Sequence, residues 1–203
     1  MEILLNAGAK VDAQDSDGMT ALRHAINVNH VPSIELLARR GADIERGTEK
    51  GYTALEVALS DGKSFAAKAL IDAGAKVNAG GGPERLTPLM VCATQLQPQQ
   101  RLNQLAHGPT PLALAEELIK RGADVNSAST DGVTALMIAA GQNSAPMIGL
   151  LLRSGADPKM KSAAGKTALD IASGAGNEAA VGALKFLTGS GTGKPANEVK
   201  TTQ

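Results

Sequence analysis

The chain has 203 residues with 20 basic and 20 acidic side chains, so its formal net charge is zero. A neutral chain lacks the basic footprint of a DNA or RNA binder and the basic stripe attracted to anionic lipid. Hydrophobic residues make up 43% of the sequence, which is typical of a folded protein, but aromatic residues make up only 1%. So few aromatic side chains also disfavour the stacking platforms that bind single-stranded nucleic acid. We therefore expect neither a nucleic acid nor a membrane as partner.

Cys92 is the single cysteine, which excludes an internal disulfide and a multi-cysteine zinc site. Its apolar neighbours predict a small buried residue rather than a nucleophile. No apolar run approaches the roughly 20 residues that cross a bilayer. The first residues show no signal-peptide pattern.

Two landmarks recur along the chain with one shared period. The dipeptide Gly-Ala begins at positions 8, 41, 74, 122 and 155, in steps of 33, 33, 48 and 33. A threonine followed by Ala or Pro and then Leu recurs with nearly the same steps, at Thr20, Thr53, Thr87, Thr134 and Thr167. Such a period indicates a stack of repeated units that bury a continuous core between neighbours.

Each period predicts two helices and an extended finger. The threonine is placed to cap an inner helix, because its side chain can accept from free backbone N–H groups. An outer helix follows, for example over 32–40, and the glycine of Gly-Ala can take the left-handed conformation that ends it. About a dozen residues between Gly-Ala and the next threonine then form the finger and its turn.

The residues within the period resemble the ankyrin repeat, whose period is about 33 and whose signature is Thr-Pro-Leu-His-x-Ala. One unit opens with Asp17-Gly18-Met19-Thr20-Ala21-Leu22 and closes with Arg40-Gly41-Ala42-Asp43-Ile44. The resemblance implies an all-α solenoid of stacked helix-turn-helix units with extended finger turns. The alanine-rich units are similar in style to bacterial ankyrin proteins.

The signature histidine is absent from every unit. Its place is taken by Arg23, Glu56, Met90, Met137 and Asp170. We expect this change to weaken a local hydrogen-bonded turn without changing the fold.

The landmarks divide the chain into an ankyrin repeat domain over 1–187 and a flexible tail over 188–203. We assign a half-unit at 1–12, full units at 13–45, 46–78, 79–126 and 127–159, and a C-terminal cap at 160–187. The third full unit carries an insertion at 95–109, which is either a tolerated surface loop or a loop that contacts a partner. Because the first unit lacks its inner helix, the chain is either a segment of a longer protein or opens with a makeshift cap.

No constellation of catalytic or metal-binding residues emerges from the sequence. The histidines His24, His30 and His107 have no metal-ligand spacing, and the carboxylates recur at turns and caps. The glycine-rich stretch ending in Lys194-Pro195 fails the phosphate-loop pattern, which requires Ser or Thr after the lysine. We therefore predict no enzyme activity and no cofactor.

The leading hypothesis is a non-catalytic scaffold that binds a protein of unknown identity through its concave surface. In ankyrin repeats generally, partners contact the finger tips and the inner helices. That resemblance implies contacts at Asp17, Met19, Asn27, Val28, Lys50, Tyr52, Ser60, Asp61, Arg85, Leu86, Thr94, Gln95, Asp131, Val133, Gln142 and Lys166. Tyr52 and Arg85 are the preferred anchors, because interface hot spots are rich in Tyr and Arg.

The alternative is an accessory ankyrin region of a longer enzyme or secreted protein. We expect a monomer. The sequence favours the cytoplasm, with the periplasm or secretion left open if an upstream signal is missing.

Overall fold

The computed structural model describes residues 2–94 and 108–189, and these ranges contain eleven helices and no strand. Most of the expected insertion, residues 95–107, and most of the expected tail, residues 190–203, lie outside the described residues. The helices are α1 (Glu2–Asn6), α2 (Ala21–Asn27), α3 (Val31–Arg39), α4 (Ala54–Ser60), α5 (Ser64–Asp72), α6 (Pro88–Thr94), α7 (Pro111–Lys120), α8 (Ala135–Gly141), α9 (Ala145–Arg153), α10 (Ala168–Gly174) and α11 (Glu178–Leu187).

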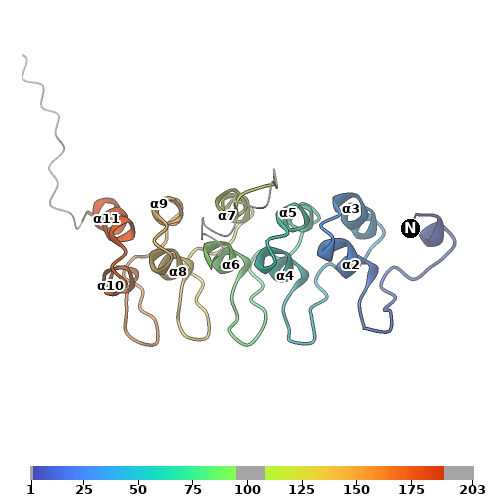
Figure 1. The fold of residues 1–203 in the computed structure, drawn as a ribbon, viewed down its shortest axis with the longest axis horizontal. Helices are drawn as coiled ribbons and strands as arrows, with labels where there is room; N and C mark the ends of the chain where they lie inside the picture. The colour runs from blue at the N-terminus through green and yellow to red at the C-terminus, as the bar shows by residue number, and fades with distance from the viewer. Residues whose placement is uncertain (1, 95–107, 190–203) are drawn as a thin grey trace, which may run out of the picture.

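The helices lie in two layers that run along one elongated stack (Figure 1). The inner layer contains α2, α4, α6, α8 and α10, and the outer layer contains α3, α5, α7, α9 and α11. A finger hangs beside each inner helix, on the side away from the outer layer (Figure 1). The predicted all-α solenoid is confirmed.

Threonine side chains start the inner helices, as the sequence predicts. The hydroxyl oxygens of Thr20, Thr53, Thr134 and Thr167 each accept a hydrogen bond from the backbone N–H three residues further on. Thr110 caps the outer helix α7 in the same way, with Pro111 as the first helical residue. Each bond satisfies one of the donors that a helix start leaves free.

The expected weakening of the turn at the signature histidine position is wrong in two units. Glu56 and Asp170 each return a side-chain hydrogen bond to the backbone N–H of the capping threonine and so complete a capping box. A carboxylate therefore replaces the histidine as the group that fixes the chain where it enters the helix.

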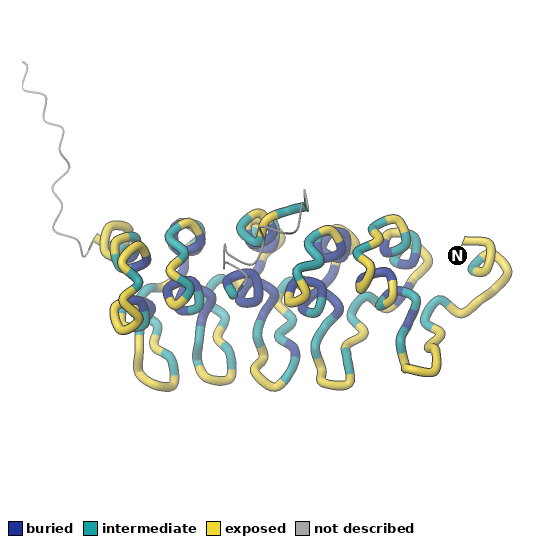
Figure 2. The backbone as a smooth tube through the Cα atoms, in the orientation of Figure 1, coloured by how far each residue is buried: buried dark blue, intermediate teal, exposed yellow. Residues whose placement is uncertain are grey.

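The core is one cluster of mainly aliphatic side chains. The buried residues lie mainly where the inner and outer helices face each other (Figure 2). The repeated leucine of the inner helix is 1–2% exposed at Leu22, Leu55, Leu89 and Leu136. Leu169, its counterpart in the last unit, is only half-buried, because no described unit stacks on that end. Cys92 is fully buried as predicted, and burial raises the pKa of its thiol to about 12.

A ladder of hydrogen bonds joins consecutive units shortly after each outer helix ends. The side-chain oxygen at one position of each unit accepts from a backbone N–H of the next unit. The pairs are Asp12 with Asp43 at 3.1 Å, and Glu45 with Lys76, Asn78 with Asp124 and Asn126 with Asp157 at 2.8 Å. This ladder fixes the spacing at which the fingers follow one another.

Candidate protein-binding surface

The described candidate residues form two rows, one on the fingers and one at the carboxyl ends of the inner helices. The first row lies on the fingers and contains Asp17, Met19, Lys50, Tyr52, Arg85, Leu86, Asp131, Val133 and Lys166. The second row lies at the carboxyl ends of the inner helices and contains Asn27, Val28, Ser60, Asp61, Thr94 and Gln142. Gln95 lies outside the described residues. We call the surface formed by these two rows the inner surface.

Most of the inner surface is open to solvent (Figure 2). Val28 is 72% exposed although it is apolar, and the charged candidates on the finger tips are exposed as well. Met19, Tyr52, Leu86, Thr94, Val133 and Gln142 are half-buried. Half-buried side chains have a fixed position yet keep a free face, a combination suited to contact residues in an interface.

The second and third fingers are packed directly against each other. The backbone N–H of Gly82 donates to the carbonyl oxygen of Gly51 at 3.1 Å, and a side chain at Gly82 would collide with the ring of Tyr52. The N–H of Gly81 donates to Glu56 Oε1 at 2.6 Å, and Glu56 is only 2% exposed. The buried carboxylate of Glu56 and the close approach of the glycines therefore fix the positions of Tyr52 and the third finger.

Arg85 has a backbone conformation that is unusual for an arginine. Its φ is 52°, whereas the corresponding residue of every other finger is a glycine with φ between 70° and 82°. Left-handed backbone is strained for residues with a Cβ atom, and such residues gather at functional sites. The sequence shows Arg85 in a glycine position, and the structure shows that the turn is unchanged.

A side-chain hydrogen bond joins His24 and Asp15 in the first full unit. Nε2 of His24 on α2 lies 2.6 Å from Oδ2 of Asp15 in the first finger. This hydrogen bond is the largest cause that lowers the pKa of Asp15, and the backbone N–H of Met19 also contributes. Both side chains are substantially exposed, so the pair orients the first finger but adds little to stability.

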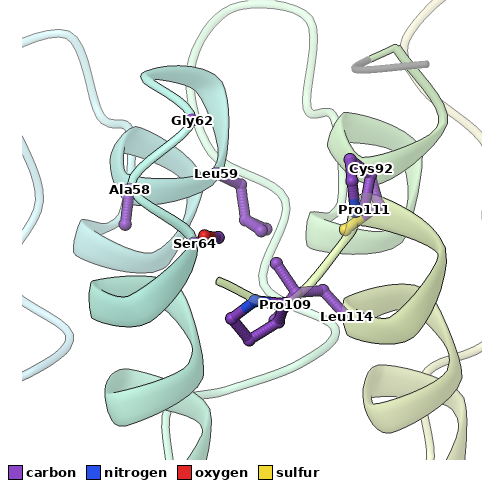
Figure 3. A pocket seen from close by; sticks show the side chains of 8 residues that line it. All are labelled: Ala58, Leu59, Gly62, Ser64, Cys92, Pro109, Pro111 and Leu114. Atoms are coloured by element: carbon purple, nitrogen blue, oxygen red, sulfur yellow. The ribbon is translucent and has the colours of Figure 1, made fainter. Parts of the chain in front are cut away.

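A small apolar hollow lies between the second and third full units (Figure 3). Its walls are Ala58, Leu59, Gly62, Ser64, Cys92, Pro109, Pro111 and Leu114. Its volume is about 10 Å³. Binding pockets for small molecules are usually about 300–1,000 Å³, so this hollow is a packing gap.

The described ranges contain no cluster of three or more His, Cys, Asp or Glu side chains that could hold a metal ion. No helix within them is long and apolar enough to cross a membrane.

Two features that support the inner surface have signals in the sequence. Glu56 departs from the signature, but Thr53-Ala54-Leu55-Glu56 has the spacing of a capping box. Gly80-Gly81-Gly82 is a run of three adjacent glycines, which indicates close backbone approach.

Comparison with known families identifies the repeat. A family described as ankyrin repeats in three copies matches residues 1–81, and one described as ankyrin repeats in many copies matches residues 118–172. Together the two matches cover more than half of the chain. The chain belongs to the ankyrin repeat family.

The chain is also similar to curated proteins of that family. It is 30% identical over 172 residues to an ankyrin repeat and KH domain-containing protein of Caenorhabditis briggsae, a match over 74% of the chain and 6% of that protein. It is 37% identical over 65 residues to protein phosphatase 1 regulatory subunit 27 of Mus musculus, a match over 32% of the chain and 42% of that protein. The chain thus spans less than half the length of these relatives.

Among solved structures, the chain is similar to one from the complex of the predatory endopeptidase Bd0816 of Bdellovibrio bacteriovorus with the immunity protein Bd3460. The TM-score is 0.73 and the sequence identity is 29%. The match covers 91% of this chain and 90% of the other. The likeness therefore extends over nearly the whole stack.

Proposed function

We propose that the chain is a non-catalytic scaffold that binds a protein partner through its inner surface. The observation that carries the proposal is the arrangement of that surface. All of the described candidate residues lie on the fingers or at the carboxyl ends of the inner helices, and all are exposed or half-buried. Stacked repeats of this kind form extended concave surfaces, which these proteins use for binding.

The comparisons support this proposal. The structurally similar chain comes from a complex of two proteins, and one curated relative is named as a regulatory subunit.

The test is affinity capture from an extract of the source organism with two matched variants as bait. The first variant replaces Lys50 and Tyr52 on the second finger with alanine. The second replaces Glu35 and Arg39, two exposed residues of the outer helix α3, with alanine. We expect a partner captured by the native chain to be lost by the first variant and kept by the second. Loss with the outer-helix variant alone would contradict the proposal.

A second candidate function is an accessory region that docks onto another part of a longer protein. The observation that favours it is the exposure of Ile3 and Leu4 on α1, which is 83% and 65%. Apolar side chains as exposed as these are suited to cover by another surface. Replacing both with serine would abolish such docking and leave capture through the fingers intact.

A further inference from the structure

A polar groove lies between the third and fourth fingers, and Arg85 of the inner surface is one of its walls. Its volume is about 250 Å³. Its walls are Asn78, Gly80, Arg85, Thr87, Ser127, Ala128, Ser129 and Thr130. The groove is large enough for one side chain of a partner and offers mainly polar contacts.

Most polar groups in these walls already have partners within the stack. Asn78 Oδ1 accepts from the N–H of Asp124 at 2.8 Å, and Ser127 Oγ donates to Asp124 Oδ2 at 3.1 Å. Ser129 Oγ accepts from the N–H of Val133 at 3.2 Å. These bonds hold the walls in place, so the groove exists before any partner arrives.

Arg85 is the exception. Its side chain is exposed, and within the described ranges its guanidinium forms neither a hydrogen bond nor an ion pair. A guanidinium carries five donors and no acceptor, and its planar fork matches the two oxygens of a carboxylate. The acids nearest along the fingers, Glu84 and Asp131, are exposed and do not pair with it.

The backbone that carries Arg85 is held by both neighbouring fingers. The N–H of Gly82 donates to the carbonyl oxygen of Gly51 in the second finger. The N–H of Thr130, in the fourth finger, donates to the carbonyl oxygen of Glu84 at 3.1 Å. The left-handed turn at Arg85 is thereby fixed, and its side chain starts from a defined place at the edge of the groove.

We propose that this groove binds a carboxylate side chain, Asp or Glu, of the protein partner, with Arg85 as the group that recognises it. This inference rests on the proposed function, because Arg85 belongs to the inner surface. It explains why an arginine occupies a position that is glycine in the other four fingers. Arg85 adds a positively charged side chain at the groove, which a glycine in the same left-handed conformation would not provide.

The test is a selection of random peptides displayed on phage, with the native chain and two variants as bait. The first variant is Arg85→Gly, which should fold because four fingers of the chain have glycine at this position. The control is Arg39→Ala, which removes an exposed arginine from the outer helix α3. A thermal melt of each variant checks that it is folded.

We expect the native chain and Arg39→Ala to select peptides enriched in Asp and Glu over the starting library, and Arg85→Gly to lose this enrichment. A synthetic copy of a selected acidic peptide should bind Arg85→Gly about tenfold or more weakly, the usual range for losing a hydrogen-bonded charge partner.

Three outcomes would overturn the inference. Peptides selected by the native chain without acidic enrichment overturn it and leave the proposed function standing. If the acidic peptides bind Arg85→Gly as tightly as they bind the native chain, the inference is also overturned and the proposed function stands. If the native chain selects no peptide above an uncoated surface, the proposed function fails together with the inference.

Discussion

The third and fourth fingers follow one repeat plan but reach the same turn by different chemistry. In the fourth finger, Ser129 Oγ accepts from the N–H of Val133, and Gly132 takes the left-handed position with φ 70°. In the third, a glycine stands where the serine would be, and Arg85 takes the left-handed position. The third finger obtains its missing support from the preceding unit, through the carboxylate of Glu56.

The difference shows that one finger can exchange local support for support from a neighbour. The fourth finger has local support from its own serine and glycine, in addition to backbone hydrogen bonds to both neighbouring fingers. The third finger depends on Glu56, 25 residues earlier in the chain, and on glycines that let the backbones touch. With this support from Glu56, the third finger keeps its turn although a charged residue, Arg85, occupies the left-handed position.

The largest loss of stability is expected from substitutions in the core. There the third and fourth full units should lose the same amount. Leu89 and Leu136 occupy the same position of the repeat, and both are 1% exposed. Truncating either to alanine should lower the free energy of unfolding by about 2–5 kcal/mol, as for other large-to-small core changes. Chemical denaturation of both variants checks this. A loss below about 0.5 kcal/mol in either would show that the faces of the helix are wrongly assigned.

The next largest loss of stability should occur in the third finger and not in the fourth. A Cβ atom at Gly81 would meet the carbonyl oxygen of Gly51 at 2.5 Å and collide with the carboxylate of Glu56. Gly81→Ala should therefore cost about 1–3 kcal/mol, the range for overfilling a packed site. The matched control is Ala128→Gly, because Ala128 is exposed at the same position of the fourth finger. Equal melting temperatures for both variants would refute the asymmetry.

A smaller effect is expected at the turn of the fourth finger. Gly132 has φ 70°, and a Cβ atom there would lie 3.1 Å from the backbone nitrogen of Ala163. Gly132→Ala should cost about 1–2 kcal/mol, because L-residues are strained in this region. Differential scanning calorimetry would detect a drop of about 2–4 °C per kcal/mol for a chain of this size. A rise in the melting temperature would contradict the argument.

The sequence predicts the parts of this fold that depend on local spacing. Each threonine cap, as at Thr134, requires only a donor three residues away, and the repeat shows the pattern five times. The contact between Glu56 and Gly81 could not be predicted in this way, because it requires the register of two stacked units. The third finger also has one additional residue before its threonine, which hides the alignment of Gly81 with Ala128.

The candidate surface shows the same division. Its position on the fingers and inner helices follows from the repeat, so the described candidates could be named beforehand. The groove beside Arg85 could not, because its walls come from two units, for example Asn78 and Ser127. The partial burial of Leu169 could not be predicted either, since Thr167-Ala168-Leu169 has the same residues as units in which the leucine is buried.

The smallest expected effect is at Arg85 itself and has the opposite sign. Replacing it with glycine relieves a left-handed conformation that costs an L-residue about 1–2 kcal/mol. Glycine also gains freedom in the unfolded chain, which offsets about 0.4–1 kcal/mol of that relief. We expect Arg85→Gly to raise the free energy of unfolding by up to about 1.5 kcal/mol, measured by urea denaturation.

The reverse exchange in the first finger tests the same balance. Gly18 has φ 71° and only the end of the Gln14 side chain within 4 Å of its absent Cβ, so a Cβ atom can be added there without a clash. Gly18→Arg should therefore lower stability by strain alone, and by an amount similar to the gain at position 85. If Arg85→Gly instead destabilises the chain, the arginine supports the third finger. Its place in a glycine position would then serve the stack and not the partner.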